Sequence, residues 1–206
     1  MKRIGIITIF DQNNYGNRLQ NYASQYIINN LENCETYTLK NYVRCNQKNN
    51  GFIDRIKCYI VFLIKKLQFA YKNIKRFERF KYFKKFDDLY INYDGFITAN
   101  NCKNIEKKFD YFIVGSDQVW NQKTKRFSYI DTLGFCNSSK RISFSASMGI
   151  CNAIGKNKNI DNVKHFKAIS VREKSAKEIL INELKDIDVK VLVDPTMFSC
   201  SEEWDN

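Results

Sequence analysis

The fold is decided at residues 4–9, which read Ile-Gly-Ile-Ile-Thr-Ile. This run is short and almost continuously apolar, as a strand buried on both faces of a parallel sheet requires. Polar residues 11–17 follow it, and apolar side chains then recur at steps of three and four residues at Leu19, Tyr22, Ala23, Tyr26 and Ile27. That spacing is typical of an amphipathic helix. The N-terminal region is therefore predicted to form a strand-loop-helix unit.

The same strand pattern returns along the rest of the chain. Short apolar runs occur at residues 36–39, 111–114, 141–145, 168–171 and 189–193. Between the last two runs, a helix over residues 173–184 gathers on one face Ala176, Ile179, Leu180 and Leu184. Strands alternating with helices predict an α/β fold with an open, Rossmann-like parallel sheet, whose ligands lie beyond the carboxyl ends of the strands.

Length and composition set the class of protein. Of the 206 residues, 44% are hydrophobic and 15% aromatic, which is enough for a packed core. Only 8 glycines and 1 proline exclude collagen-like and low-complexity structures. The longest apolar candidate for a membrane span covers residues 58–64, far below the roughly 18 residues needed, and the first ten residues lead into polar sequence without a signal-peptide cleavage site. We therefore expect a cytoplasmic protein.

The cysteines and the single histidine indicate no metal or cofactor. The 7 cysteines contain no C-x-x-C pair and no metal-finger spacing, so we expect reduced, mostly buried thiols. His165 has no acid or nucleophile at a helpful spacing, and one histidine cannot define a triad or a metal site. We assign it no role and predict no metal site.

The positive charge is concentrated in one segment. The net charge is +12, and residues 55–85 hold 11 basic residues against one acid, Glu78, which makes +10. From residue 53 to residue 77, apolar side chains keep a heptad-like spacing, which predicts a long helix or helical pair. We interpret residues 52–87 as a basic helical excursion inserted into the sheet domain.

Three interpretations of this excursion remain open. In the one we favour, its apolar seam packs on the domain and its lysines are solvated. In the second, residues 55–85 make a peripheral contact with the inner face of the membrane, because an interfacial helix combines basic flanks with an apolar face. In the third and least favoured, nucleic-acid bases stack on its aromatic side chains, which are Phe77, Phe80, Tyr82, Phe83 and Phe86.

Three polar clusters follow directly on predicted strands, where a ligand site belongs. The first, residues 13–18, includes Asn14, Tyr15, Gly16 and Asn17. It precedes a helix whose N-terminal amides and dipole favour an anion by roughly 0.3 to 1 kcal/mol. Taken alone, this Asn-Gly sequence is also what an ordinary turn uses.

The other two clusters supply hydrogen-bonding groups and a cation. In the second, Gly115 lets the backbone turn sharply, and groups suited to sugar hydroxyls are supplied by Ser116, Asp117, Gln118 and Asn121. The third is Arg172-Glu173, where the guanidinium can bind a carboxylate or phosphate through two hydrogen bonds. The alternatives are a helix cap at residues 116–117 and a local ion pair at residues 172–173.

These clusters belong to motifs that resemble a known family. The motifs are residues 4–7 with 14–23 (NYGNRLQNYA), 109–121 (FDYFIVGSDQVWN), 140–149 (KRISFSASMG), 169–175 (ISVREKS) and 193–196 (VDPT). In this order they closely resemble the polysaccharide pyruvyl transferase family. The resemblance implies transfer of a pyruvyl group from phosphoenolpyruvate to a sugar of a cell-surface polysaccharide, on a two-domain architecture like that of GT-B glycosyltransferases.

The resemblance also assigns roles. It makes Arg172 a contact to the anionic donor, and it makes residues 14–17 and Asp117 part of the lining of the cleft. We expect the same lining to include Gly115, Ser116, Gln118 and Asn121. Phosphoenolpyruvate is a donor substrate, so no cofactor is implied. The acceptor is a sugar or a lipid-linked glycan.

The chain departs from the family in one respect. Family members look longer and carry, in a second domain, a serine-phenylalanine-histidine-glycine type motif whose histidine is usually assigned to catalysis. No such motif occurs here. We therefore expect residues 1–195 to form the N-terminal domain and residues 196–206 to begin a linker to a missing C-terminal domain, which holds most of the catalytic residues and can be a separate polypeptide. The alternative is a non-catalytic remnant that binds glycan or a partner polypeptide.

Overall fold

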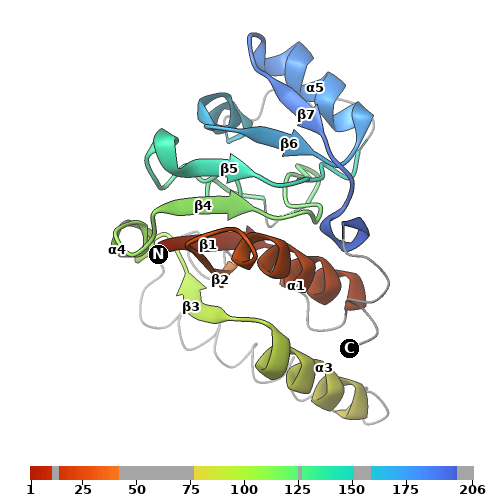
Figure 1. Cartoon of the computed structure of the whole chain (residues 1–206). Helices are drawn as coiled ribbons and strands as arrows, with labels where there is room; N and C mark the ends of the chain where they lie inside the picture. The colour runs from red at the N-terminus through yellow and green to blue at the C-terminus, as the bar shows by residue number, and fades with distance from the viewer. Residues whose placement is uncertain (11–13, 42–76, 125–126, 151–158, 199–206) are drawn as a thin grey trace, which may run out of the picture.

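A computed structural model of the chain describes residues 1–10, 14–41, 77–124, 127–150 and 159–198 (Figure 1). Its strands are β1 (Lys2–Thr8), β2 (Cys34–Asn41), β3 (Tyr93–Ile97), β4 (Tyr111–Val114), β5 (Arg141–Ser143), β6 (Ile169–Val171) and β7 (Val189–Val191). Its helices are α1 (Tyr15–Asn29), α3 (Phe77–Tyr90), α4 (Cys102–Glu106) and α5 (Lys174–Leu184), with short 3-10 turns η3 (Ser138–Lys140), η4 (Ile160–His165) and η5 (Pro195–Met197). The chain is a mixed α/β protein, as the sequence predicted.

The strands form a parallel sheet. Five of them lie in the order β3-β2-β1-β4-β5, and β6 pairs with β7 in a second parallel ladder. Parallel bridges from Ile142 to Ala168 and from Ala146 to Val171 connect β5 to β6, so the second ladder continues the first. In Figure 1 the arrowheads of β4, β5, β6 and β7 point the same way. The prediction of an open parallel sheet is confirmed.

The strand order places a crevice between β1 and β4. After β1 the chain continues to β2 and β3 on one side, and it returns through β4 to β5 on the other. Loops that follow two such neighbouring strands diverge, which opens a ligand site at their carboxyl ends. The first two polar clusters of the sequence follow these two strands.

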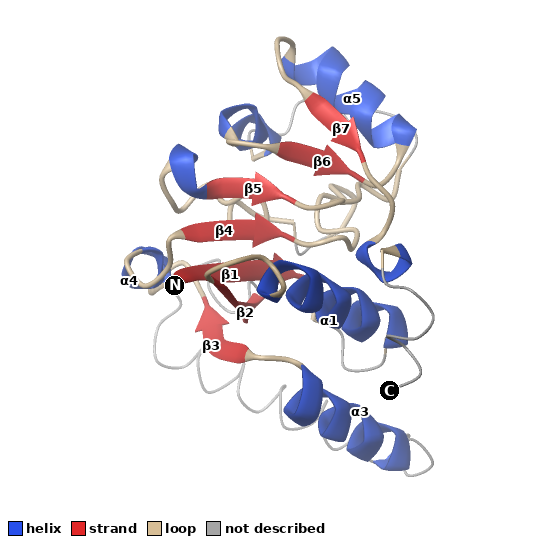
Figure 2. Ribbon diagram, viewed as in Figure 1, coloured by secondary structure: helices blue, strands red, loops and turns tan. Residues whose placement is uncertain are grey.

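Helices cover the sheet on two faces (Figure 2). Ile28 of α1 packs with Ile4, Ile6 and Ile113 on one face, and the neighbouring side chains of β1 and β4 belong to a larger cluster that includes Trp120. The buried face of α5 consists of the four predicted residues, Ala176, Ile179, Leu180 and Leu184. Successive side chains of β1 and β4 pack into apolar clusters on opposite faces of the sheet, and for this reason both strands are almost continuously apolar in sequence.

Two strands end earlier than the sequence predicted. β5 stops at Ser143 because one additional residue separates the two bridges to β6, and Ser145 takes a left-handed conformation with φ of 53°. This is the geometry of a β-bulge, which ends regular pairing. β7 stops at Val191, and residues 192–194 lead into η5. β3 and α4 were not predicted at all, because neither carries a long periodic apolar pattern.

The basic excursion falls largely outside the described residues, because residues 42–76 are not described. Its last part is α3, where Phe83 is buried and its ring lies 4.4 Å from Tyr15 of α1. The lysines of this helix, Lys81, Lys84 and Lys85, are exposed. No described helix is long and apolar enough to cross a membrane.

Candidate functional site

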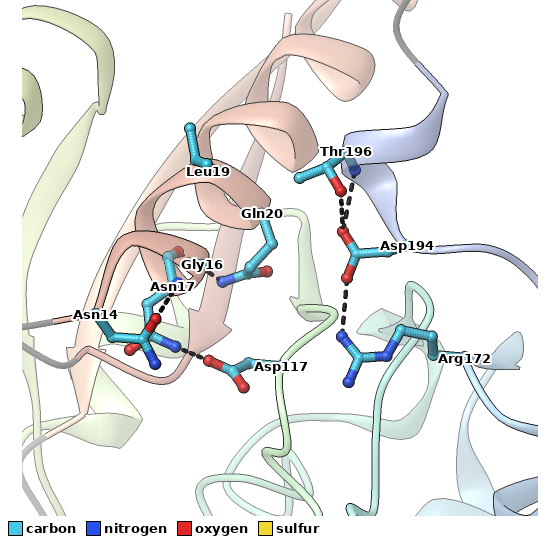
Figure 3. Close-up of a pocket in the computed structure, with 9 residues that line it drawn as sticks. All are labelled: Asn14, Gly16, Asn17, Leu19, Gln20, Asp117, Arg172, Asp194 and Thr196. Atoms are coloured by element: carbon cyan, nitrogen blue, oxygen red, sulfur yellow. Dashed lines mark hydrogen bonds and ion pairs between the residues drawn. The ribbon is translucent and has the colours of Figure 1, made fainter.

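A pocket of about 380 Å³ lies at the carboxyl ends of the strands (Figure 3). Its lining residues are Asn14, Gly16, Asn17, Leu19, Gln20, Asp117, Arg172, Asp194 and Thr196. They come from the segments that follow β1, β4, β6 and β7. Members of all three polar clusters singled out in the sequence therefore line one pocket.

The first wall is the start of α1. Asn14 is the N-cap, and its side-chain oxygen accepts a hydrogen bond from the backbone N–H of Asn17 at 3.3 Å. The side-chain amide of Asn17 donates to the carboxylate of Asp117. This bond joins the first turn of α1 to the loop after β4 across the crevice.

Gln20 connects the ends of β1 and β4 through its buried side-chain amide. Its amide nitrogen donates to Thr8 Oγ1 at 2.8 Å and to the carbonyl of Asn17 at 3.0 Å, and its oxygen accepts from the backbone N–H of Ser116 at 3.2 Å. Gln20 is only 4% exposed. A buried amide with all these partners holds the start of α1 against the ends of β1 and β4.

The opposite side of the pocket carries Arg172. Its Nε lies 3.1 Å from Glu173 Oε1, and its Nη1 lies 2.9 Å from Asp194 Oδ2. Burial acts to lower the pKa of Arg172, but the hydrogen bonds that it donates to Asp194 and Glu173 outweigh burial and raise that pKa. Within the described part of the chain, Nη2 makes no hydrogen bond, so a permanently charged group keeps donors available to a ligand.

The local ion pair considered as an alternative at residues 172–173 is thus present, and the structure adds Asp194 to it. Asp194 Oδ2 accepts from Ser116 Oγ at 2.6 Å, and its Oδ1 accepts from the N–H and hydroxyl of Thr196 at 3.0 and 2.8 Å. Burial acts to raise the pKa of Asp194, but these hydrogen bonds, with that from Arg172, hold the pKa below its usual value. The carboxylate is therefore ionised at neutral pH.

The sequence analysis missed Asp194, Thr196 and Gln20 as pocket residues. Asp194-Pro195-Thr196 was quoted only as part of a family motif, although it directly follows a predicted strand, as the other clusters do. Gln20 lies one helical turn after Gly16, a spacing that puts both on one side of α1. Position after a strand was therefore a usable signal for Asp194 and Thr196.

Five of the predicted cleft residues do not line this pocket. Tyr15 is 58% exposed and packs beside Phe83 of α3, and Gln118 Oε1 accepts from Asn121 at 3.2 Å on the exposed surface. Ser116 is fully buried behind Asp194.

Gly115 is explained by close packing rather than by a special turn. A Cβ on Gly115 would lie 3.0 Å from the Cβ of Thr8, and the φ of Gly115 is not in the left-handed region. The residue is small because the ends of β1 and β4 approach closely there.

The pocket combines one cation with a hydrogen-bonding wall. Arg172 is suited to an anionic group, whereas Asp117, Asn17 and Asn14 offer carboxylate and amide groups of the kind that bind hydroxyls. Among the described residues, no group of three or more His, Cys, Asp or Glu side chains can hold a metal ion. His165 is exposed on η4 and is not part of the lining.

A family model for polysaccharide pyruvyl transferase matches residues 14–206 of the chain. The chain belongs to this family. The match covers every residue that lines the pocket, from Asn14 to Thr196. Comparisons with curated proteins and with solved structures found no match. The family is a transferase family, and at that level it implies a polysaccharide acceptor.

Proposed function

We propose that this pyruvyl transferase family member binds phosphoenolpyruvate and takes part in transferring its pyruvyl group to a sugar of a cell-surface polysaccharide or of its lipid-linked precursor. The observation that carries the proposal is the pocket itself. It places a charged guanidinium with free donors on one side and a carboxylate-amide wall on the other, both within the matched region.

Arg172 serves the donor in this proposal. Phosphoenolpyruvate carries a phosphate and a carboxylate, and a guanidinium binds either group through two parallel hydrogen bonds. The side chain of Arg172 is 33% exposed, so its contact with the anion is partly shielded from water. That shielding strengthens the interaction relative to one on an open surface.

The wall formed by Asn14, Asn17 and Asp117 serves the acceptor. Ketal formation needs two hydroxyl groups of one sugar. The first hydroxyl oxygen bonds to C2 of the enol, and its proton is transferred in net terms to C3. The bond from C2 to the phosphate oxygen then breaks as the second hydroxyl oxygen bonds to C2, and the proton of that hydroxyl passes to the departing phosphate, which leaves as inorganic phosphate. Hydroxyls that bind a carboxylate and an amide are held in a fixed orientation, which lowers the barrier to such a reaction.

The proposed reaction also needs an acid-base group and further stabilisation of the leaving phosphate. We propose that both come largely from outside the described pocket, from a second domain or a separate polypeptide with the family's histidine motif. The chain by itself is then nearly inactive.

The test is a transfer assay with phosphoenolpyruvate and a glycan acceptor, which measures phosphate release and the mass of the ketal product. The chain is assayed alone and together with a polypeptide that carries the histidine-bearing domain of a family member. Little turnover alone and clear turnover on mixing support the proposal. Full activity of the chain alone contradicts the division of labour, and glycan binding without any turnover under either condition favours the non-catalytic alternative.

A further inference from the structure

Asp194 is a pocket residue whose hydrogen-bonding capacity is already filled. Its carboxylate accepts four hydrogen bonds, from Ser116 Oγ, from the N–H and Oγ1 of Thr196, and from Arg172 Nη1. An ionised carboxylate has about four lone-pair sites. Although Asp194 lines the pocket, it therefore has no site left for a ligand, and its contacts are all to the protein.

We propose that Asp194 is a positioning residue that fixes the guanidinium of Arg172 for anion binding. The proposal rests on the donor role of Arg172 given above. Asp194 occupies Nη1 and Glu173 occupies Nε, so Nη2 is the end left to face a ligand. Figure 3 shows the guanidinium joined to Asp194 through one terminal nitrogen while the other points away from it.

The anchor that holds Asp194 is rigid. Ser116 follows β4 and is fully buried, and Pro195 is the buried first residue of η5. Asp194 caps this turn through Thr196, so the ends of β4 and β7 together determine where its carboxylate lies. A free arginine side chain samples many rotamers and loses this entropy when it is held in one conformation. Fixing it before the ligand arrives improves affinity by preorganisation.

Charge alone predicts the opposite effect of Asp194. A carboxylate 2.9 Å from the guanidinium weakens the attraction of the pocket for a negatively charged ligand. If Asp194 acted only through its charge, Asp194→Asn would bind phosphoenolpyruvate more tightly. If Asp194 positions Arg172, the same variant binds more weakly, because the asparagine side chain cannot replace the ion pair. The sign of the effect therefore separates the two roles.

The experiment is a calorimetric titration of the full chain with phosphoenolpyruvate. We expect Asp194→Asn and Asp194→Glu each to raise the Kd roughly tenfold, because both displace or remove one charge-assisted hydrogen bond to Arg172. Thr196→Val removes one anchor of Asp194 and keeps the volume, and we expect a smaller loss of roughly threefold. Asp88→Asn is the control, because Asp88 is exposed on α3 and pairs only with Lys84 among the residues described. It should leave the Kd unchanged.

A double-mutant cycle completes the test. In an Arg172→Ala background, Asp194→Asn should have no further effect on the Kd, since the residue it positions is gone. The positioning role is overturned if Asp194→Asn and Thr196→Val both bind as tightly as the wild type or more tightly, or if the effects of Arg172→Ala and Asp194→Asn simply add. A wild-type chain that does not bind phosphoenolpyruvate overturns the donor site itself. Thermal melts of each variant distinguish a folded variant from an unfolded one. If Asp194→Asn does not fold, the Kd of Thr196→Val decides the question.

Discussion

At the scale of single residues, Arg172 combines two observed ion pairs with the donor contact that we propose. Arg172→Lys keeps the charge but cannot contact Asp194, Glu173 and a ligand with one planar group. We expect Arg172→Lys to raise the KM for phosphoenolpyruvate, and Arg172→Ala to weaken donor use further, by about 1.5 to 3 kcal/mol. Steady-state kinetics of the chain mixed with the histidine-bearing domain of a family member, together with thermal melts of the same variants, check this. A lower melting temperature with unchanged KM and kcat would assign Arg172 a structural role only.

Asp194 also makes the stability of the fold sensitive to acid. Its pKa in the folded chain lies below the usual value of about 4. The stabilising hydrogen bonds are therefore fully present above the unfolded-state pKa and are lost as the pH falls through the folded-state pKa. We expect the melting temperature of the wild type to fall more steeply below about pH 4 than that of Asp194→Asn. Melts across the acid range measure this, and parallel curves would contradict it.

The residue scale also shows what a sequence can predict about a site. Arg172, Asp117 and the residues at the start of α1 were recognised because they follow apolar strands, whose carboxyl ends share one edge of a parallel sheet. The hydrogen bonds among them were not predictable. Ser116 donates to Asp194, which lies 78 positions later, and only the arrangement of β4 and β7 brings the two together.

At the scale of elements, α3 is fastened to α1 by a buried ion pair. Arg18 Nη2 donates to Asp87 Oδ2 at 3.1 Å, and the two side chains are only 7% and 11% exposed. The guanidinium lies 4.1 Å from the ring centre of Phe83, and its Nη1 donates to the carbonyl of Asn14, the cap residue in the pocket wall. The end of the inserted segment is thus connected to the wall of the site through Arg18.

This connection gives a prediction for stability. Asp87→Ala leaves the guanidinium of Arg18 buried without its carboxylate, and we expect the free energy of unfolding to fall by about 3 to 5 kcal/mol. Asp88→Ala, at the next position, breaks only the exposed pair with Lys84 and should change it by about 0 to 1 kcal/mol. Denaturant unfolding of both variants measures the difference. Equal, small effects would show that the buried pair does not hold α3 to the domain.

The elements α5, β4 and β6 were predicted to within one residue, whereas β3 and α4 were not predicted and β5 and β7 end earlier than predicted. The face of α5 was read from its sequence because Ala176, Ile179, Leu180 and Leu184 keep a helical period. The early end of β5 depends on the left-handed Ser145, whose side chain donates to the carbonyl of Val193 on a distant segment. A contact between segments so far apart in the chain cannot be predicted from a local sequence pattern.

At the scale of the whole molecule, the order of the strands determines the site. The sequence predicted that the strands are parallel, but not that β1 and β4 are neighbours, since nothing in either run specifies its partner. Their adjacency lets Asn17 bond to Asp117 over a separation of 100 positions. The cleft is therefore a property of the topology, to which the sequence contributes the side chains.

The uneven charge of the molecule gives the last prediction. Of the net +12, residues 55–85 carry +10, and the described part of that segment exposes Lys81, Lys84 and Lys85 on α3. If this segment contacts an anionic membrane surface, the triple change of these lysines to glutamine should weaken binding to vesicles that contain phosphatidylserine, because each basic residue near such a surface contributes about 1 kcal/mol.

The matched control is the same triple change at Lys103, Lys107 and Lys108, which are exposed in and just after α4, outside the basic segment. It removes an equal charge, so a general attraction to anions predicts equal losses for the two triple variants. Contact through the basic segment instead predicts a loss mainly for the variant on α3, together with binding that declines as salt is added. Vesicle sedimentation at several salt concentrations measures both. Equal binding by the wild type and the α3 variant would show that these lysines make no membrane contact. Tight binding to an oligonucleotide at low salt would instead favour the nucleic-acid interpretation. Such binding depends strongly on salt, because counterions are released from the phosphates.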